Sequence, residues 1–447
     1  MRWEGGGFSA FLVTAMNRLM GIVLFLTAAL ASAFSAFGQD GGSFVPPDDL
    51  STSLLICQPG RSFYSGFGHC ALRLQCPSHG LDVTFTYALD DNLANRIAMF
   101  RGRGAGRYSS VRTAAFLEEY VQEGRGVVDY PVNISVEQTR ALWQILDGEN
   151  ASPRFRQYNF LHTNCASMCF YALERVMNGR SSESHQARFD GRVVTDGGKA
   201  KGEEIVWDGL SEGCTGTYRT FVGYVSRGRP WTGLFWNSIL GATGEETGRL
   251  EDKLAPMLVE PVIAKATIRR SDGGEARPFL KGEPVCLVEQ TLTYPRNPFT
   301  PTVVFALLLA VAVFVSLYER LRGYNVVLRT FDILLLVMQT LAGLFIFYLS
   351  CLSHMVGAAH NWNIIVFNPL PLLLWICFRR RRWFPRVYLF YAAVLLLYIA
   401  SWTFRPNVTL PHVLLALTFL VRTSMRIGDI RKARGSHKTK EKTKKYD

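Results

Sequence analysis

Residues 69–89, HCALRLQCPSHGLDVTFTYAL, predict the fold of the first half of the chain. Positions in residues 69–76 alternate as on a strand: one face carries Cys70, Leu72, Leu74 and Cys76, the other His69, Ala71, Arg73 and Gln75. Residues 77–80 are typical of a turn, and residues 82–89 alternate again. The stretch therefore predicts an antiparallel hairpin that begins at His69.

Helical patterns follow the hairpin, which itself follows a short apolar run at residues 54–57. Residues 115–123 and 135–146 have helical periodicity, and the second begins with Ser135 and Gln138 at capping-box spacing. Strands followed by helices predict an α+β domain.

The most informative helix pattern begins after Asn164. Asn164 is a suitable N-cap, an apolar stripe follows at helical spacing, and Asn178-Gly179 ends it. Cys165 is then the first residue of the helix. The helix dipole and the free amide hydrogens there favour a thiolate and can hold a developing oxyanion.

The N-terminal part has the order of a secretory signal. Within residues 16–38, Arg18 precedes an apolar run, and small residues follow up to Ala33 and Gly38, near which we expect cleavage. Met16 is a candidate start. We therefore assign residues 1–39 to a signal peptide; a first membrane span is the alternative.

The chain after Pro301 predicts an all-α transmembrane domain of about five helices, residues 301–421. The apolar runs are residues 302–318, 331–352, 362–378, 387–404 and 410–421. Most approach the roughly 20 residues that a bilayer requires. The third contains Pro369 and Pro371, so we expect it to be kinked or partly re-entrant.

Charge sets the orientation of these runs. Arginines follow the first, third and fifth, whereas the other two breaks hold only Arg405. The positive-inside rule then puts the basic tail, residues 422–447, in the cytoplasm and residues 40–300 outside it. Residues 301–447 have a net charge of +14, and the whole chain has +13. Residues 1–300 are therefore about neutral. High basicity thus reflects membrane topology, and a nucleic-acid role loses its support.

Cysteine usage bears on both pairing and metals. Of nine cysteines, Cys351 and Cys377 fall in predicted spans, and the other seven lie outside the cytoplasm, where disulfides can form. Seven is odd, so at least one should remain unpaired. No spacing fits a zinc site, and we predict no metal.

His69 and Cys165 are the candidate catalytic residues. Taken alone, a histidine at a strand edge is more often structural, and a lone cysteine is more often a disulfide half or a buried apolar residue. Together, a thiol at a helix start and an imidazole on a strand are what a papain-like plan needs. We place them in a catalytic domain at residues 40–180, followed by an extension at residues 181–300 that packs on that domain or on the membrane surface.

Short motifs carry a resemblance to known families. Ser65–His69, SGFGH, with Arg73, and Tyr158-Asn159-Phe160 with Asn164-Cys165 resemble the signatures of permuted papain-like domains. The whole plan resembles Lnb, a family of bacterial lipoprotein N-acyltransferases that pairs such a periplasmic domain with a membrane domain containing HNWN…NPL, here residues 360–363 and 368–370. The likeness is weakest over residues 180–250. Families of this plan often add a polar residue on the next strand, for which Asp90 is our candidate.

The resemblance implies acyl transfer through a Cys165 thioester at the inner membrane. The donor would be a membrane phospholipid or the diacylglyceryl group of the lipoprotein, the acceptor the amine of its N-terminal cysteine, and no cofactor is needed. Drawing a C16 chain into water costs about 12 kcal/mol, so the site should adjoin the bilayer. Residues 231–240 are a candidate interfacial helix, with an ordinary core helix as the alternative.

Other interpretations remain open from the sequence. His354, His360, Asn361 and Asn363 can bind a head group or the substrate amine, or can be loop residues without a function. A membrane-anchored cysteine peptidase or amidase acting on cell-wall peptide would use the same Cys/His pair but would need only one span. A non-catalytic envelope assembly protein would explain the spans but not the thiol opposite a histidine.

Overall fold

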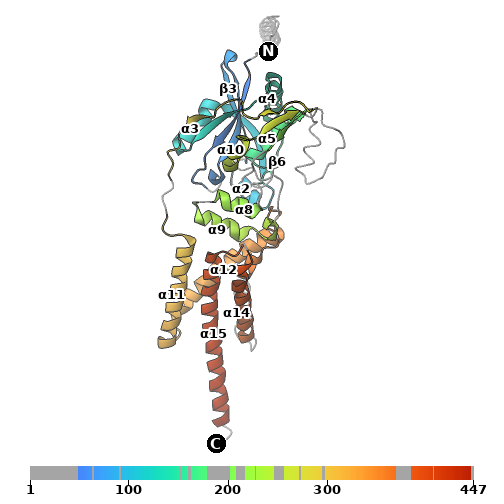
Figure 1. Cartoon of the computed structure of the whole chain (residues 1–447). Helices are drawn as coiled ribbons and strands as arrows, with labels where there is room; N and C mark the ends of the chain where they lie inside the picture. Colours follow the sequence, from blue (N-terminus) through green and yellow to red (C-terminus); the bar gives the residue numbers. More distant parts are fainter. Residues whose placement is uncertain are drawn as a thin grey trace, which may run out of the picture. The chain divides into compact units, whose positions relative to one another are not determined.

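The computed structural model describes residues 49–447 except 63–64, 90–91, 152, 160–162, 179–201, 208–216, 227, 246–255, 271–272, 294–296, 369–383, 406 and 444–447. The predicted signal peptide lies outside these residues, as do Asp90 and most of the third predicted span. Figure 1 shows a sheet-containing part followed by long helices. The predicted α+β class, with a helical second half, is confirmed.

The first half is built on a seven-stranded sheet in the order β10-β5-β1-β2-β3-β4-β6, and every neighbouring pair is antiparallel. The strands are β1 (Ser51–Cys57), β2 (His69–Cys76), β3 (Leu81–Leu89), β4 (Ala105–Arg112), β5 (Val127–Pro131), β6 (Arg156–Gln157) and β10 (Val285–Val288). The predicted hairpin is β2–β3, and its register runs from Ala71 opposite Thr86 to Cys76 opposite Leu81. Its turn is a 3₁₀ helix, Pro77–His79, closed by Gly80 at φ 60°.

Helices cover both faces of this sheet (Figure 1). The larger core joins Leu72, Leu74 and Phe85 to α4 (Val136–Ala151), α5 (Cys165–Asn178) and α10 (Pro256–Ile263). On the opposite face, α3 (Thr113–Glu123) packs Phe116 and Tyr120 against Leu55 and Ala71. Ala71 is fully buried, so the face of β2 that carries His69, Ala71 and Arg73 is also covered near its centre.

Two predicted helix starts have the expected caps. The Gln138 amide nitrogen donates to Ser135 Oγ at 3.2 Å, and the Ser135 amide donates to Gln138 Oε1 at 2.9 Å, which forms the predicted capping box before α4. Asn164 Oδ1 accepts from the amides of Ala166 and Ser167, each at 3.0 Å, at the start of α5. The caps fix where Cys165 enters its helix.

The region between α5 and the membrane helices adds small elements. A second sheet has the order β7-β8-β9, with β7 at Glu203–Val206, β8 at Thr267–Arg270 and β9 at Arg277–Pro278. Helices α8 (Tyr218–Val225) and α9 (Pro230–Ile239) follow β7, and α2 (Leu93–Phe100) lies between β3 and β4. Residues far along the chain also return to the main sheet as β10.

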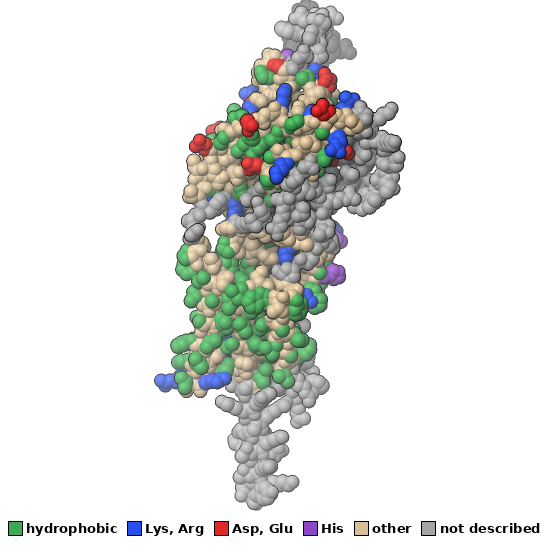
Figure 2. All heavy atoms as spheres, viewed as in Figure 1, with side chains coloured by type: hydrophobic (Ala, Val, Ile, Leu, Met, Phe, Trp, Pro, Cys, Tyr) green, Lys and Arg blue, Asp and Glu red, His purple; other side chains and the backbone are tan. Residues whose placement is uncertain are grey.

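The second half is a bundle of apolar helices: α11 (Pro301–Arg322), α12 (Val326–Phe347), α14 (Phe384–Ala400) and α15 (Leu410–Thr443). Among the described residues, three helical segments are long and apolar enough to cross a membrane, and residues 387–403 form a shorter apolar helix. Figure 2 shows apolar side chains gathered over these helices, with charged side chains concentrated on the sheet domain and near the opposite end of the bundle.

Helix α9 joins the two halves. The Asn361 and Asn363 amide groups donate to the Ser238 carbonyl at 2.8 and 3.1 Å, and Asn363 also donates to the Asn237 carbonyl at 3.0 Å. These bonds satisfy carbonyls that the helix end leaves unpaired. The asparagines of the HNWN motif therefore hold α9, and this structural use accounts for their burial.

Gly241, just after α9, permits a close approach of its backbone to that of residues 357–359. A Cβ on Gly241 would lie 1.8 Å from the Ala359 carbonyl oxygen, and the Gly241 amide donates to the Gly357 carbonyl at 2.8 Å. A second joint links the end of α2 to the residue after the π-helical turn Tyr348–Leu352, which continues α12: Ser353 Oγ donates to the Phe100 carbonyl at 2.6 Å. The two halves thus meet through backbone contacts as well as side chains.

Candidate functional site

Cys165 lies at the start of α5 with only 5% of its surface exposed. The backbone amides of Cys70, Ala166 and Cys165 itself lie close enough to its sulfur to lower the pKa of the thiol. Burial has the larger effect and raises that pKa to about 11. The expected helix-end donors are present, but desolvation outweighs them, so the resting group is a thiol.

His69 begins β2 and points toward the face covered by α3, where its ring centroid lies 6.4 Å from that of Phe116. Its Nε2 and the Thr86 Oγ1 of β3 are 2.5 Å apart and share a hydrogen bond. Burial, together with the positive charge of Arg125, lowers the pKa of His69 to about 4. The imidazole is therefore neutral near pH 7 and can accept a proton.

Cys165 and His69 line the same cavity, which has a volume of about 590 Å³. Apolar groups such as Phe67, Leu89 and Phe116 line it as well. The thiol and the imidazole do not hydrogen-bond to each other, and Nδ1 of His69 has no partner among the described residues. Catalytic hydrogen bonds often tighten only when substrate is bound.

The third predicted residue, Asp90, lies outside the described residues. The described polar neighbour of His69 on the next strand is Thr86, which belongs to none of the short sequence motifs. The alternation pattern of the hairpin could have predicted this contact. Thr86 lies opposite Ala71, so it is diagonally across from His69 on the same face.

Charged residues also line this cavity. The Arg125 guanidinium lies 4.5 Å from the Tyr120 ring centroid, donates to the Gln58 carbonyl at 2.8 Å and bonds to Glu123 at 2.8 Å. Its charge lowers the pKa of both Cys165 and His69. Glu119 and Arg96 are further lining residues. The cavity thus has charged groups of both signs around a neutral thiol and a neutral imidazole.

Tyr158, the first residue of the Tyr158-Asn159-Phe160 motif, has a structural role beside Cys165. Its phenol lines the cavity, its ring stacks on that of Tyr87 with centroids 5.9 Å apart, and the Cys165 amide is directed at its oxygen. Burial raises the pKa of Tyr158, so it remains a neutral phenol. The residue therefore helps to set the position of the chain just before α5.

Two family models match the chain in the order that the fold displays. The Lnb N-terminal periplasmic domain matches residues 42–197, and the Lnb transmembrane domain matches residues 293–433. The chain belongs to the Lnb family. No curated protein and no solved structure matches it.

Membership in the Lnb family indicates a role in lipoprotein maturation, and it makes the protein an inner-membrane protein with a periplasmic domain. The sheet domain that carries His69 and Cys165 is then periplasmic. The orientation predicted from charge agrees with this assignment, since α11 ends in Arg320 and Arg322 on the far side from that domain.

In this Lnb-family protein the cavity is tied to the layer that meets the membrane helices. Arg229, just before α9, donates to the Gly66 carbonyl at 2.7 Å, and the Phe67 ring meets Trp236 with centroids 5.5 Å apart. In turn, Trp231 of α9 donates its indole N–H to the Phe299 carbonyl at 2.8 Å. The predicted interfacial helix therefore packs inward through Trp236 and toward α11 through Trp231.

Cysteine pairing and metal sites can be judged for the described part of the chain. There, the buried free thiols are Cys57, Cys70, Cys76, Cys165 and Cys169, and the exposed ones are Cys286 and Cys351. No group of three or more His, Cys, Asp or Glu side chains in the described ranges is placed to hold a metal ion. Cys165 is thus available as a thiol.

Proposed function

We propose that the protein transfers an acyl chain from a lipid ester to the N-terminal cysteine amine of a lipoprotein, through a thioester on Cys165. The observation that carries this proposal is the shared cavity of Cys165 and His69, with the thiol at a helix start near backbone amides that lower its pKa. This arrangement supports a permuted papain-like plan, and family membership supplies the lipoprotein context.

The first half-reaction forms the thioester. His69 takes the thiol proton as the Cys165 sulfur attacks the ester carbonyl carbon, and the backbone amides near the sulfur stabilise the negative charge on the carbonyl oxygen. The carbon–oxygen ester bond then breaks, and the protonated His69 gives its proton to the departing alcohol. The products are an acyl-Cys165 thioester and a lipid that has lost one acyl chain.

The second half-reaction forms the amide. The neutral α-amine of the lipoprotein attacks the thioester carbonyl, His69 accepts a proton from the amine, and the carbon–sulfur bond breaks as Cys165 regains a proton. Thioester and amine give amide and thiol, so the balance needs no further reactant. The opposite pKa shifts of the thiol and the imidazole favour proton transfer coupled to attack over a preformed ion pair.

The surroundings of the cavity support a lipid donor. Its lining includes Phe67, Leu89 and Phe116, and the Gly66–Phe67 segment is bonded to the α9 layer, which packs against the membrane helices. An acyl chain can therefore reach the thiol with little exposure to water. Glu119, an exposed carboxylate in the lining, can attract the ammonium form of the acceptor.

The decisive test is to trap the thioester. Full-length protein is incubated with a phospholipid ester or a diacylated lipopeptide, and acylated peptides are mapped by mass spectrometry with and without hydroxylamine. We expect a hydroxylamine-sensitive acyl group on Cys165 that is absent in Cys165→Ala. The matched control is Cys169→Ala, because Cys169 is also buried in α5 but does not line the cavity.

Cellular lipoproteins provide the second readout. In cells that depend on this protein, Cys165→Ala should abolish N-acylation, whereas Cys169→Ala should retain it. An acyl group on another residue, or an unchanged N-terminal acylation pattern in cells without the protein, would refute the transferase. Altered cell-wall peptides in the same cells would point to the peptidase alternative.

A further inference from the structure

A second cavity lies in the membrane bundle, on the side away from the periplasmic domain. Its volume is about 400 Å³, and it is formed by residues of α12, α14 and α15 and by the loop before α12. The lining includes three arginines, Arg329, Arg422 and Arg426, together with Tyr324, Tyr388 and Gln339. Arginines are expensive inside a membrane, so their gathering around a cavity requires an explanation.

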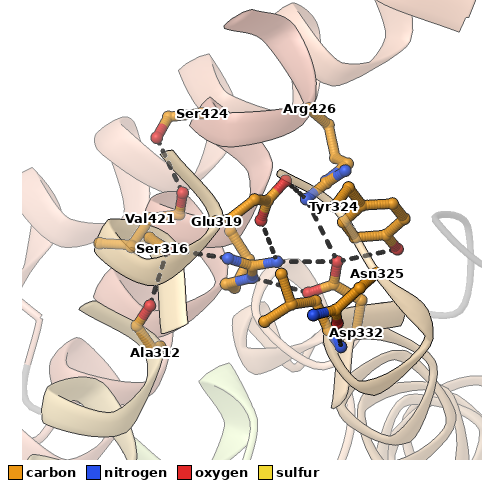
Figure 3. A network of polar contacts seen from close by, with 11 residues as sticks. Ala312, Ser316, Glu319, Tyr324, Asn325, Asp332, Val421, Ser424 and Arg426 are labelled. Atoms are coloured by element: carbon orange, nitrogen blue, oxygen red, sulfur yellow. Dashed lines mark hydrogen bonds and ion pairs between the residues drawn. The ribbon is translucent and has the colours of Figure 1, made fainter. Parts of the chain in front are cut away.

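Two of the arginines are held in a network with acidic partners (Figure 3). Arg422 donates to Asp332 at 2.6 Å through Nε and to Glu319 at 2.8 Å through Nη2. Arg426 pairs with Glu319 and lies 3.6 Å from Asp332. Tyr324 lies under Arg426, with the guanidinium carbon 4.0 Å from the ring centroid. These contacts tie Arg422 and Arg426 into one wall of the cavity.

Arg329 is different, because it lines the cavity without an acidic partner among the described residues. It lies near the cytoplasmic start of α12 and is exposed. Arg422 and Arg426 pair with the carboxylates of Glu319 and Asp332, so Arg329 adds one net positive charge to this described group. An anion at the cavity mouth would balance it.

The lining changes from charged to apolar with depth. Arg329, Asp332, Leu336 and Gln339 follow one another at helical spacing on α12, so the wall runs about 15 Å along the helix. That length is about half of a hydrocarbon core of roughly 30 Å, or one leaflet. Leu335, Leu336 and Phe419 line the cavity beside the charged groups. The shape suits a molecule with an anionic head and an apolar chain.

We propose that this cavity binds the phosphate of an anionic phospholipid from the cytoplasmic leaflet. Arg329 bonds to the phosphate, the wall of Arg422 and Arg426 adds positive potential, and the start of an acyl chain occupies the apolar part. Guanidinium groups suit this role because they bind phosphate oxygens through paired N–H donors. The site is separate from the Cys165 cavity and does not depend on the proposed acyl transfer.

The test measures lipid retained by the purified full-length protein. Native mass spectrometry in detergent compares phosphatidylglycerol with phosphatidylcholine of the same acyl chains, and a thermal-shift assay compares both lipids with inorganic phosphate. The variant is Arg329→Gln. Its matched control is Arg320→Gln, because Arg320 is also an exposed arginine at the cytoplasmic end of a helix but does not line the cavity.

We expect phosphatidylglycerol to be retained preferentially and Arg329→Gln to lower its affinity about fivefold or more, since one arginine near anionic lipid contributes about 1 kcal/mol. Arg320→Gln should change it little. Leu336→Trp, which fills the apolar part without changing charge, should also weaken retention.

Equal retention of the two lipids, or equal losses in Arg329→Gln and Arg320→Gln, would overturn the proposal. Stabilisation by inorganic phosphate that depends on Arg329 and matches that by phosphatidylglycerol would assign the site to a free anion instead. Unchanged retention in Leu336→Trp would likewise exclude a chain in the apolar part.

Discussion

The two cavities of this protein differ in the charge state of their polar groups. Around Cys165 and His69, burial moves the two pKa values apart, to about 11 and about 4, so both reactive groups are neutral. Around Arg422, Glu319 and Asp332 the groups are bonded as complementary charges. The difference fits the proposed uses: a nucleophile and a base would exchange protons with substrate, whereas a paired network holds helices and shapes a site.

Removing the base should have the largest effect on the periplasmic cavity. His69→Ala leaves no group to accept the thiol proton, and general-base catalysis contributes about 10²–10⁴-fold, so thioester formation should slow by that factor. Single-turnover mass spectrometry of Cys165 acylation measures it. A variant with a normal rate and a normal thermal midpoint would remove His69 from the mechanism.

Breaking the membrane network should lower stability rather than acylation chemistry. Arg422→Met leaves Glu319 and Asp332 without their main partner, and removing one member of a buried ion pair costs about 3–5 kcal/mol. Detergent-solubilised protein should therefore unfold at a lower temperature, as a thermal-shift assay would detect. The control, Arg320→Met, removes an exposed arginine outside the network and should change the midpoint little. Equal effects would contradict the assigned importance of the network.

The raised pKa of the Cys165 thiol predicts that its reactivity near neutral pH is lower by about two orders of magnitude. A pKa near 11 instead of the ordinary 9 reduces the thiolate fraction near neutral pH about 100-fold. Alkylation of Cys165 by iodoacetamide should therefore keep rising with pH up to about 11. Peptide mapping at each pH gives the profile, with exposed Cys286 as an internal check that the reagent is active. A plateau near neutral pH would indicate a preformed thiolate.

The smallest effect is expected at Thr86. Thr86→Val removes the hydroxyl that holds His69 Nε2, which should lower the turnover number about fivefold through a misplaced ring, because one hydrogen bond contributes about 1 kcal/mol. Thr86→Ser keeps the hydroxyl and should restore the rate. A fall in stability without a change in turnover, or no rescue by serine, would limit Thr86 to a structural role. Asp90 is then the residue to test in the same assay.

Local rules predicted the elements that hold the site. Alternation gave β2 from His69 to Cys76, and the cap residues Ser135 and Asn164 gave the starts of α4 and α5. These features depend on neighbours within a few residues, where periodicity and capping are strong signals. The resemblance to Lnb, from short motifs and the order of the domains, is confirmed by the family models.

Other features required contacts across long stretches of chain. The burial of Ala71 depends on α3, and the partner of His69 depends on the β2–β3 register. The use of Asn361 and Asn363 to hold the end of α9 depends on contacts more than a hundred residues away along the chain. The pKa of Cys165 could not be judged from its helix position, because the desolvation that dominates it comes from the surrounding fold.

By itself, the sequence determined that this chain has a periplasmic α+β part before apolar helices, that Cys165 starts a helix and that His69 starts a strand. Those properties follow from hydrophobic period, charge and local hydrogen bonding. Only the tertiary structure decided that the thiol and the imidazole line one cavity and that burial keeps both neutral. It also decided that three arginines line a second cavity. Solvent exclusion and pairing are properties of packed surroundings, which no short stretch of chain specifies alone.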